Sequence, residues 1–86
     1  MNENEIKMKW ELYETCDFGL IVFLSLAFPI IEIKRADSKR LFFVFDKSPE
    51  LIDCIDNYWR GDARVDPNRF LAQTRVIKAK ISDYGN

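Results

Sequence analysis

The sequence predicts an α+β domain of two layers, with element order β-α-β-β-α-α and helices packed on one face of a small antiparallel sheet. Three observations predict this class. Short segments alternate apolar and polar residues, two pairs of residues (Ser48-Pro49 and Asp66-Pro67) mark helix starts, and the length of 86 residues leaves room for one domain. Hydrophobic residues make up 48% of the chain, which is enough to form a core and argues against intrinsic disorder.

The N-terminal part is predicted to contain one short strand. Residues 1–7 are polar and are expected to form a flexible N-terminus, so the single α+β domain is assigned to residues 8–86. Residues 8–14 alternate apolar and polar side chains, with Trp10 among the apolar ones. This period of two predicts a strand.

An apolar helix is predicted next, over residues 18–28. Side-chain oxygens of Thr15 and Asp17 can both cap its first turn. Pro29 ends it, because the residue before a proline avoids the α region. Ser25 is its only polar side chain, so the helix needs to be covered on all sides.

A β-hairpin is predicted after this helix. Residues 30–35 form its first strand, residues 36–39 a polar turn and residues 40–45 the return strand. Because successive side chains of a strand point to opposite faces, Phe42 and Val44 are expected to lie on the same face.

Two further helices are predicted from their end signals. The first begins at Ser48-Pro49 and ends at Gly61, a residue that favours a left-handed helix cap. The second begins at Asp66-Pro67. Its stripe of core-facing residues has helical spacing and consists of Phe70, Thr74, Ile77, Ile81 and Tyr84.

Several short motifs together resemble one known family. They are the Thr15-x-Asp17 helix start, the Phe43-Val44-Phe45 strand, and the segments Tyr58-Trp59-Arg60-Gly61 and Val65-Asp66-Pro67. Over roughly residues 12–84 the chain resembles a family of small prokaryotic and viral domains known as a domain of unknown function. The resemblance implies an α+β fold and a genome context rich in phages and mobile elements. It implies no activity, cofactor or catalytic residue.

Basic residues gather where the hairpin reverses direction, at Lys34, Arg35, Lys39 and Arg40. Phe42 and Trp10 are expected beside them on the open face of the sheet. Aromatic platforms next to cations bind single-stranded nucleic acid, so one hypothesis is a nucleic-acid-associated accessory protein. The alternative is that these cations only keep the hairpin tip soluble and protect a sheet edge.

The apolar helix also predicts a homodimer. Five other short elements are not expected to cover every side of residues 18–28, so a second chain is expected to complete the cover. The predicted interface consists of Leu20, Phe23, Leu24 and Val44. The alternative is a monomer that encloses the helix at its centre.

A protein-interaction module is the second functional hypothesis, for example a phage-encoded inhibitor or a regulatory subunit. It predicts an exposed apolar or acidic patch along Asp53, Asp56 and Asn57. Catalysis is not expected, because the chain has no His and its three glycines form no phosphate-binding loop.

No cofactor or metal site is predicted, since carboxylates such as Asp53 and Asp56 are typical of a solvated helix face. Cys16 and Cys54 are expected to be reduced, buried thiols of a cytoplasmic protein, with a disulfide between them as the alternative. Residues 18–31 carry no charge but are too few to span a membrane, so no membrane association is expected.

Overall fold

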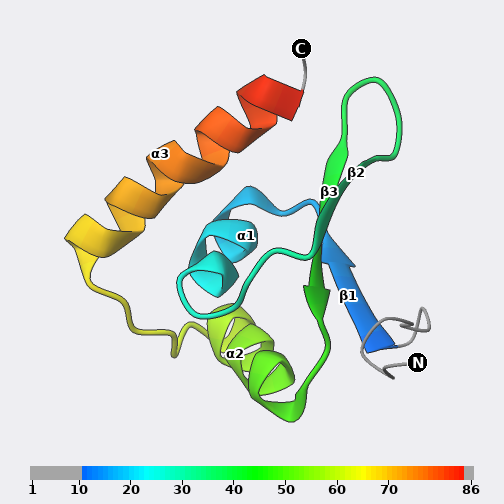
Figure 1. The fold of residues 1–86 in the computed structure, drawn as a ribbon. Coiled ribbons are helices and arrows are strands. Elements are labelled where there is room, and N and C mark those ends of the chain that lie inside the picture. The colour runs from blue at the N-terminus through cyan, green and yellow to red at the C-terminus, as the bar shows by residue number, and fades with distance from the viewer. Residues whose placement is uncertain (1–10, 85–86) are drawn as a thin grey trace.

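The computed structural model describes residues 11–84, and its elements follow the predicted order (Figure 1). This confirms the α+β class and the order β-α-β-β-α-α. The strands are β1 (Leu12–Thr15), β2 (Glu32–Arg35) and β3 (Leu41–Asp46). The helices are α1 (Phe18–Ser25), α2 (Pro49–Arg60) and α3 (Pro67–Tyr84).

The three strands form an antiparallel sheet in which β3 is central, in the order β1-β3-β2. Val44 of β3 lies opposite Glu14 of β1 and opposite Glu32 of β2. Side chains alternate between the faces, so Phe43 and Phe45 point to one face and Val44 to the other. The antiparallel pairing of β2 with β3 confirms the predicted hairpin, although β2 begins at Glu32 rather than at residue 30 and β3 lies one residue later than predicted.

Strand β1 differs in its bounds from the predicted strand. Residues 8–10 of the prediction, including Trp10, lie outside the described residues. The described strand begins at Leu12 and continues to Thr15, past the predicted end. Thr15 stays in the strand because its partner is Phe43 of β3, and its hydroxyl accepts a hydrogen bond from the Asp17 backbone N–H at 3.1 Å.

Helix α2 matches its prediction at both ends. The Ser48 hydroxyl accepts a hydrogen bond from the Leu51 N–H at 3.1 Å, and Pro49 occupies the first turn. Gly61 ends the helix in the left-handed conformation, with φ of 80°. That conformation is strained for residues with a Cβ atom, so these local signals determine where α2 begins and ends.

Helix α1 is shorter than the predicted residues 18–28. Asp17 caps it as expected, with its carboxylate accepting the Leu20 N–H at 2.9 Å. After Ser25 three-residue hydrogen bonds appear, from Leu26 N to Phe23 O and from Ala27 N to Leu24 O, beside a last four-residue bond from Phe28 N to Leu24 O. The chain thus leaves the helix before Pro29 forces it to. No described helix is long and apolar enough to cross a membrane.

The core gathers around α1. It combines residues of α1 with Phe43 and Phe45 of β3, Leu51 and Ile55 of α2, and Ile77 of α3. Figure 1 shows α1 between the sheet, α2 and the long diagonal α3. A polar contact also joins α3 to α1, since the Gln73 amide nitrogen lies 2.9 Å from the Ser25 hydroxyl oxygen.

This arrangement corrects the premise of the predicted dimer. Leu20 and Leu24 are fully buried within one chain, and Val44 is fully buried as well. Helix α3 packs against α1 through residues such as Ile77 and, together with α2 and β3, supplies the cover that the sequence was expected to lack. Of the four predicted interface residues, only Phe23 keeps an exposed surface, because it is half-buried. Dimerisation itself stays a prediction.

Candidate functional site

The turn between β2 and β3 is a structured loop rather than a loose tip. The Asp37 carboxylate accepts hydrogen bonds from the backbone N–H groups of Lys39, at 2.8 Å, and of Arg40, at 2.9 Å. The Ala36 N–H donates to the Arg40 carbonyl at 3.0 Å. These bonds fix the backbone while the side chains of Lys39 and Arg40 remain exposed.

The four cations predicted as a cluster do not share one surface. Lys34 lies on the same face as Val44, where its ammonium pairs with Glu14 of β1 at 2.8 Å. This hydrogen bond raises the pKa of Lys34 above its ordinary value of 10.5. Arg35, the next residue, points to the other face, where its guanidinium lies 5.5 Å from the centre of the Tyr84 ring.

The sheet face that carries Phe42 is a poor surface for phosphates. The pattern of pairing places Glu14, Glu32 and Asp46 on the same face as Phe42. Phe42 itself is half-buried, and Trp10, its expected companion, lies outside the described residues. Among the described strand residues of this face, carboxylates outnumber the one cation, Lys34, and an excess of negative charge repels a polyanion.

Lys39 and Arg40 instead border a cavity of about 290 Å³ on the other side of the hairpin. We call it the hairpin cavity. It lies between the β2–β3 loop, the start of α1 and the last turns of α3, and its remaining lining residues are Cys16, Phe18, Ile21, Leu41, Phe43 and Ile81. Phe18 is 37% exposed. The lining therefore combines two cations, an accessible aromatic residue and an apolar floor, and among the described residues it includes no carboxylate.

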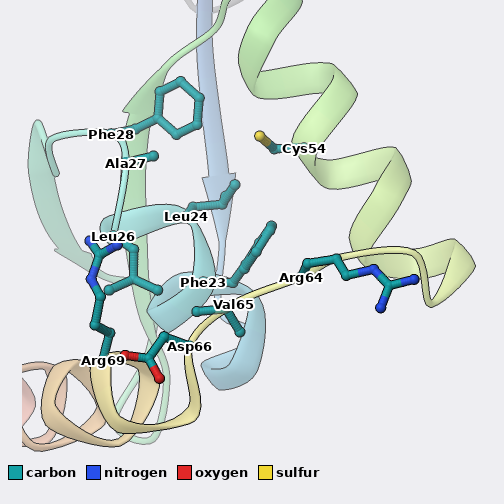
Figure 2. Close-up of a pocket in the computed structure, with 10 residues that line it drawn as sticks. All are labelled: Phe23, Leu24, Leu26, Ala27, Phe28, Cys54, Arg64, Val65, Asp66 and Arg69. Carbon is teal, nitrogen blue, oxygen red and sulfur yellow. The ribbon is translucent and has the colours of Figure 1, made fainter.

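A second cavity, of about 320 Å³, lies at the other end of α1. We call it the loop cavity, because the connection between α2 and α3 passes over it (Figure 2). Its apolar lining consists of Phe23, Leu24, Leu26, Ala27, Phe28, Cys54 and Val65. Figure 2 shows Arg64 and Arg69 at opposite sides of it, with Asp66 between them.

The two cysteines lie in different cavities. Both are free thiols, and Cys54 is half-buried. Cys16, expected to be buried, is exposed, because it follows the buried Thr15 at the point where the strand ends and its side chain turns outward. Within residues 11–84, no three His, Cys, Asp or Glu side chains come together as a metal site would require.

Tyr58 links α2 to the start of α1, a contact that the sequence did not reveal. Its ring centre lies 5.6 Å from that of Phe23 and 5.0 Å from that of Trp59. Its hydroxyl lies over Gly19, so closely that a Cβ atom at that position would overlap it. The absence of a side chain at Gly19 therefore makes room for the Tyr58 hydroxyl, which is a structural reason for a glycine in the first turn of α1.

Alkaline pH is expected to destabilise the fold through Tyr13 and Tyr58. Burial is the main cause that raises the pKa of each above the ordinary value of 10.0, and the Asp17 carboxylate raises both further. The tyrosines of the unfolded chain then ionise first, so the free energy of unfolding falls as pH rises above 10 toward the folded pKa values.

Urea unfolding at about pH 8 and about pH 11 checks this expectation. The double variant Tyr13→Phe/Tyr58→Phe should lose less stability between the two conditions than the natural chain. An equal loss in both proteins would contradict the assigned role of these tyrosines.

Comparison with protein families gives one match. A family described as a domain of unknown function, DUF5659, matches residues 10–84. Comparisons with curated proteins and with solved structures gave no match.

Proposed function

We propose, from the premise that the chain belongs to the DUF5659 family, that it is a non-catalytic module that binds single-stranded nucleic acid at the hairpin cavity. One observation carries this proposal. Lys39 and Arg40 border the same cavity as the exposed Phe18, and no carboxylate of residues 11–84 lines it. This site retains the basic loop of the predicted one but replaces Phe42 and Trp10 with Phe18.

The chemistry of a nucleotide matches that lining. Phosphates pair with ammonium and guanidinium groups, and the flat face of a base stacks on an aromatic ring. The apolar floor formed by residues such as Leu41 and Ile81 can cover the second face of a base. Paired bases cannot enter such a site, which favours single strands over a duplex.

Binding is expected to be weak to moderate and dependent on salt. Two phosphate contacts would give a slope of about −1.4 for log K against log salt concentration. The formal net charge of the chain is −1, so the protein as a whole does not attract a negatively charged oligonucleotide. The affinity therefore depends on the local pair Lys39 and Arg40.

Fluorescence anisotropy of a labelled oligothymidine at several salt concentrations tests the proposal. Arg40→Glu should weaken binding by at least about tenfold and flatten the salt slope, since it removes one phosphate contact and adds repulsion. Phe18→Ala should weaken binding by at least about fivefold while the slope stays unchanged, since stacking involves no released counterion.

Lys47→Glu is the matched control. It makes the same change of charge at an exposed residue that lines neither cavity, so it should bind nearly as the natural chain does. Equal effects of Arg40→Glu and Lys47→Glu would mean that bulk charge, and not the hairpin cavity, governs binding. Binding that is unchanged in every variant would overturn the proposal.

The loop cavity favours a second candidate function, that of a protein-interaction module. Its apolar lining and flanking arginines are typical of surfaces that receive an apolar side chain of another protein. A chain that ignores oligonucleotides at low salt but associates with a protein through this cavity would support the second candidate.

A further inference from the structure

Trp59 is an exposed aromatic side chain at the last turn of α2. It is 60% exposed, more than any other large hydrophobic residue of the described chain. The Tyr58 ring packs against it in a T-shaped arrangement, with ring centres 5.0 Å apart and ring planes at 89°. Side chains that are rigid, aromatic and partly supported are the usual anchors of protein interfaces.

The loop cavity is large enough for such an anchor. An engineered protein cavity of roughly 150 Å³ holds benzene, and the loop cavity measures about 320 Å³, which leaves room for the larger indole. Phe23, Leu26 and Phe28 provide the apolar walls that an indole ring requires.

The anchor and the cavity belong to one patch of the surface. Tyr58 is the ring neighbour of both Trp59 and Phe23, a residue of the cavity wall. A patch that contains both a projecting side chain and a cavity can pair with a second copy of itself about a two-fold axis. We propose that two copies of this chain associate in this way, each inserting Trp59 into the loop cavity of the other.

Charge supports the same partner. Of the exposed charged side chains around Trp59, Arg60 and Asp62 form an ion pair at 3.5 Å, so the carboxylate of Asp56, one helical turn before Trp59, carries the excess negative charge. The cavity carries Arg64 and Arg69. The two-fold pairing brings Asp56 of one chain toward guanidinium groups of the other, and among the described residues that line the cavity Arg64 and Arg69 outnumber the single carboxylate of Asp66.

The interface differs from the one that the sequence predicted. Phe23 and Leu24 line the loop cavity and so stay near the contact, whereas Leu20 and Val44 are buried and do not line it. The dimer thus does not complete the core. It buries an exposed anchor in a preformed cavity, so each chain is folded before it associates.

Analytical ultracentrifugation over a range of protein concentrations tests the pairing. Trp59→Ala should weaken the dimer by at least about 30-fold, as expected for a central aromatic anchor. Ala27→Glu, at an exposed residue of the cavity lining, should have a similar effect, because the longer charged side chain occupies the cavity that receives Trp59 of the other chain. Val76→Ala, at an exposed residue of α3 that lines neither cavity, should leave the dimer unchanged.

Mixing the two defective variants provides the decisive measurement. The Trp59→Ala chain keeps its cavity and the Ala27→Glu chain keeps its anchor, so a mixture retains one of the two contacts. The mixture should dimerise more tightly than either variant alone. Weak dimers in the mixture, a natural chain that stays monomeric at millimolar concentration, or a Trp59→Ala dimer of full strength would each overturn the proposal.

Fluorescence gives a second readout that keeps both Trp59 and the cavity lining intact. In a Trp10→Phe chain, Trp59 is the one remaining tryptophan. Its emission should shift to shorter wavelength as the protein concentration rises, because the indole leaves water. An emission maximum that does not change with concentration would contradict insertion of Trp59.

Discussion

Replacing Leu20 with alanine is expected to lower the free energy of unfolding by about 3 kcal/mol, and by the same amount at every protein concentration. Leu20 is fully buried in the first turn of α1, where it belongs to the core formed with β3, α2 and α3. Removing its side chain leaves a cavity that the surrounding helices fill only in part. For a domain of this length the total stability is roughly 4–13 kcal/mol, so the loss is a large share of it.

Leu71→Ala is the matched control for this prediction. It makes the same chemical change in α3, but Leu71 is 55% exposed, so the expected loss is below about 0.5 kcal/mol. Chemical denaturation of both variants at two protein concentrations measures the difference. If the loss caused by Leu20→Ala became smaller as concentration rose, Leu20 would be buried by a partner chain rather than by its own.

The sequence predicted α2 well because the signals that limit it are local. Ser48 and Pro49 start the helix, and Gly61 stops it by a backbone conformation that other residues adopt at a cost. Such signals act within a few residues, so they can be found without knowledge of the rest of the fold. The strands of the hairpin were found for the same reason, from alternation over four to six residues.

The surroundings of α1 could not be predicted in this way. Its composition shows that it is covered on all sides, but it does not show what covers it. The answer depends on the path of α3, which crosses the chain after a separation of more than forty residues and is tied to α1 through Gln73 and Ser25. Local patterns hold no information about that crossing.

The candidate site was predicted in part. The basic loop was identified, but Lys34 and Arg35 were grouped with it although adjacent residues of a strand point to opposite faces. Alternation alone would have separated them. No local pattern could have predicted the hairpin cavity or the role of Phe18 in it, because the cavity is formed by three segments that are distant in the sequence.

Replacing Gly19 with alanine is expected to destabilise the protein by about 1–3 kcal/mol, opposite in sign to what helix propensity predicts. Propensity alone favours alanine in a helix by about 1 kcal/mol. The added Cβ atom, however, would overlap the Tyr58 hydroxyl. That oxygen lies on the long axis of the ring, so it moves away only if the whole Tyr58 side chain swings about χ1, and Phe23 and Trp59 both pack against this ring.

A double-mutant cycle separates the two effects. Tyr58→Phe removes the overlapping oxygen, and the nearest remaining ring atom lies 3.5 Å from the position of the Cβ atom, an ordinary contact. In that background Gly19→Ala should be neutral or should stabilise the protein by up to about 1 kcal/mol. Denaturant unfolding of the four proteins gives the coupling energy. If Gly19→Ala destabilised both backgrounds equally, the close approach of Tyr58 would not be the reason for glycine at this position. If Gly19→Ala destabilised only the protein that contains Tyr58, the result would show that Gly19 allows the close contact of α1 with α2 at Tyr58, the residue that also packs against Trp59.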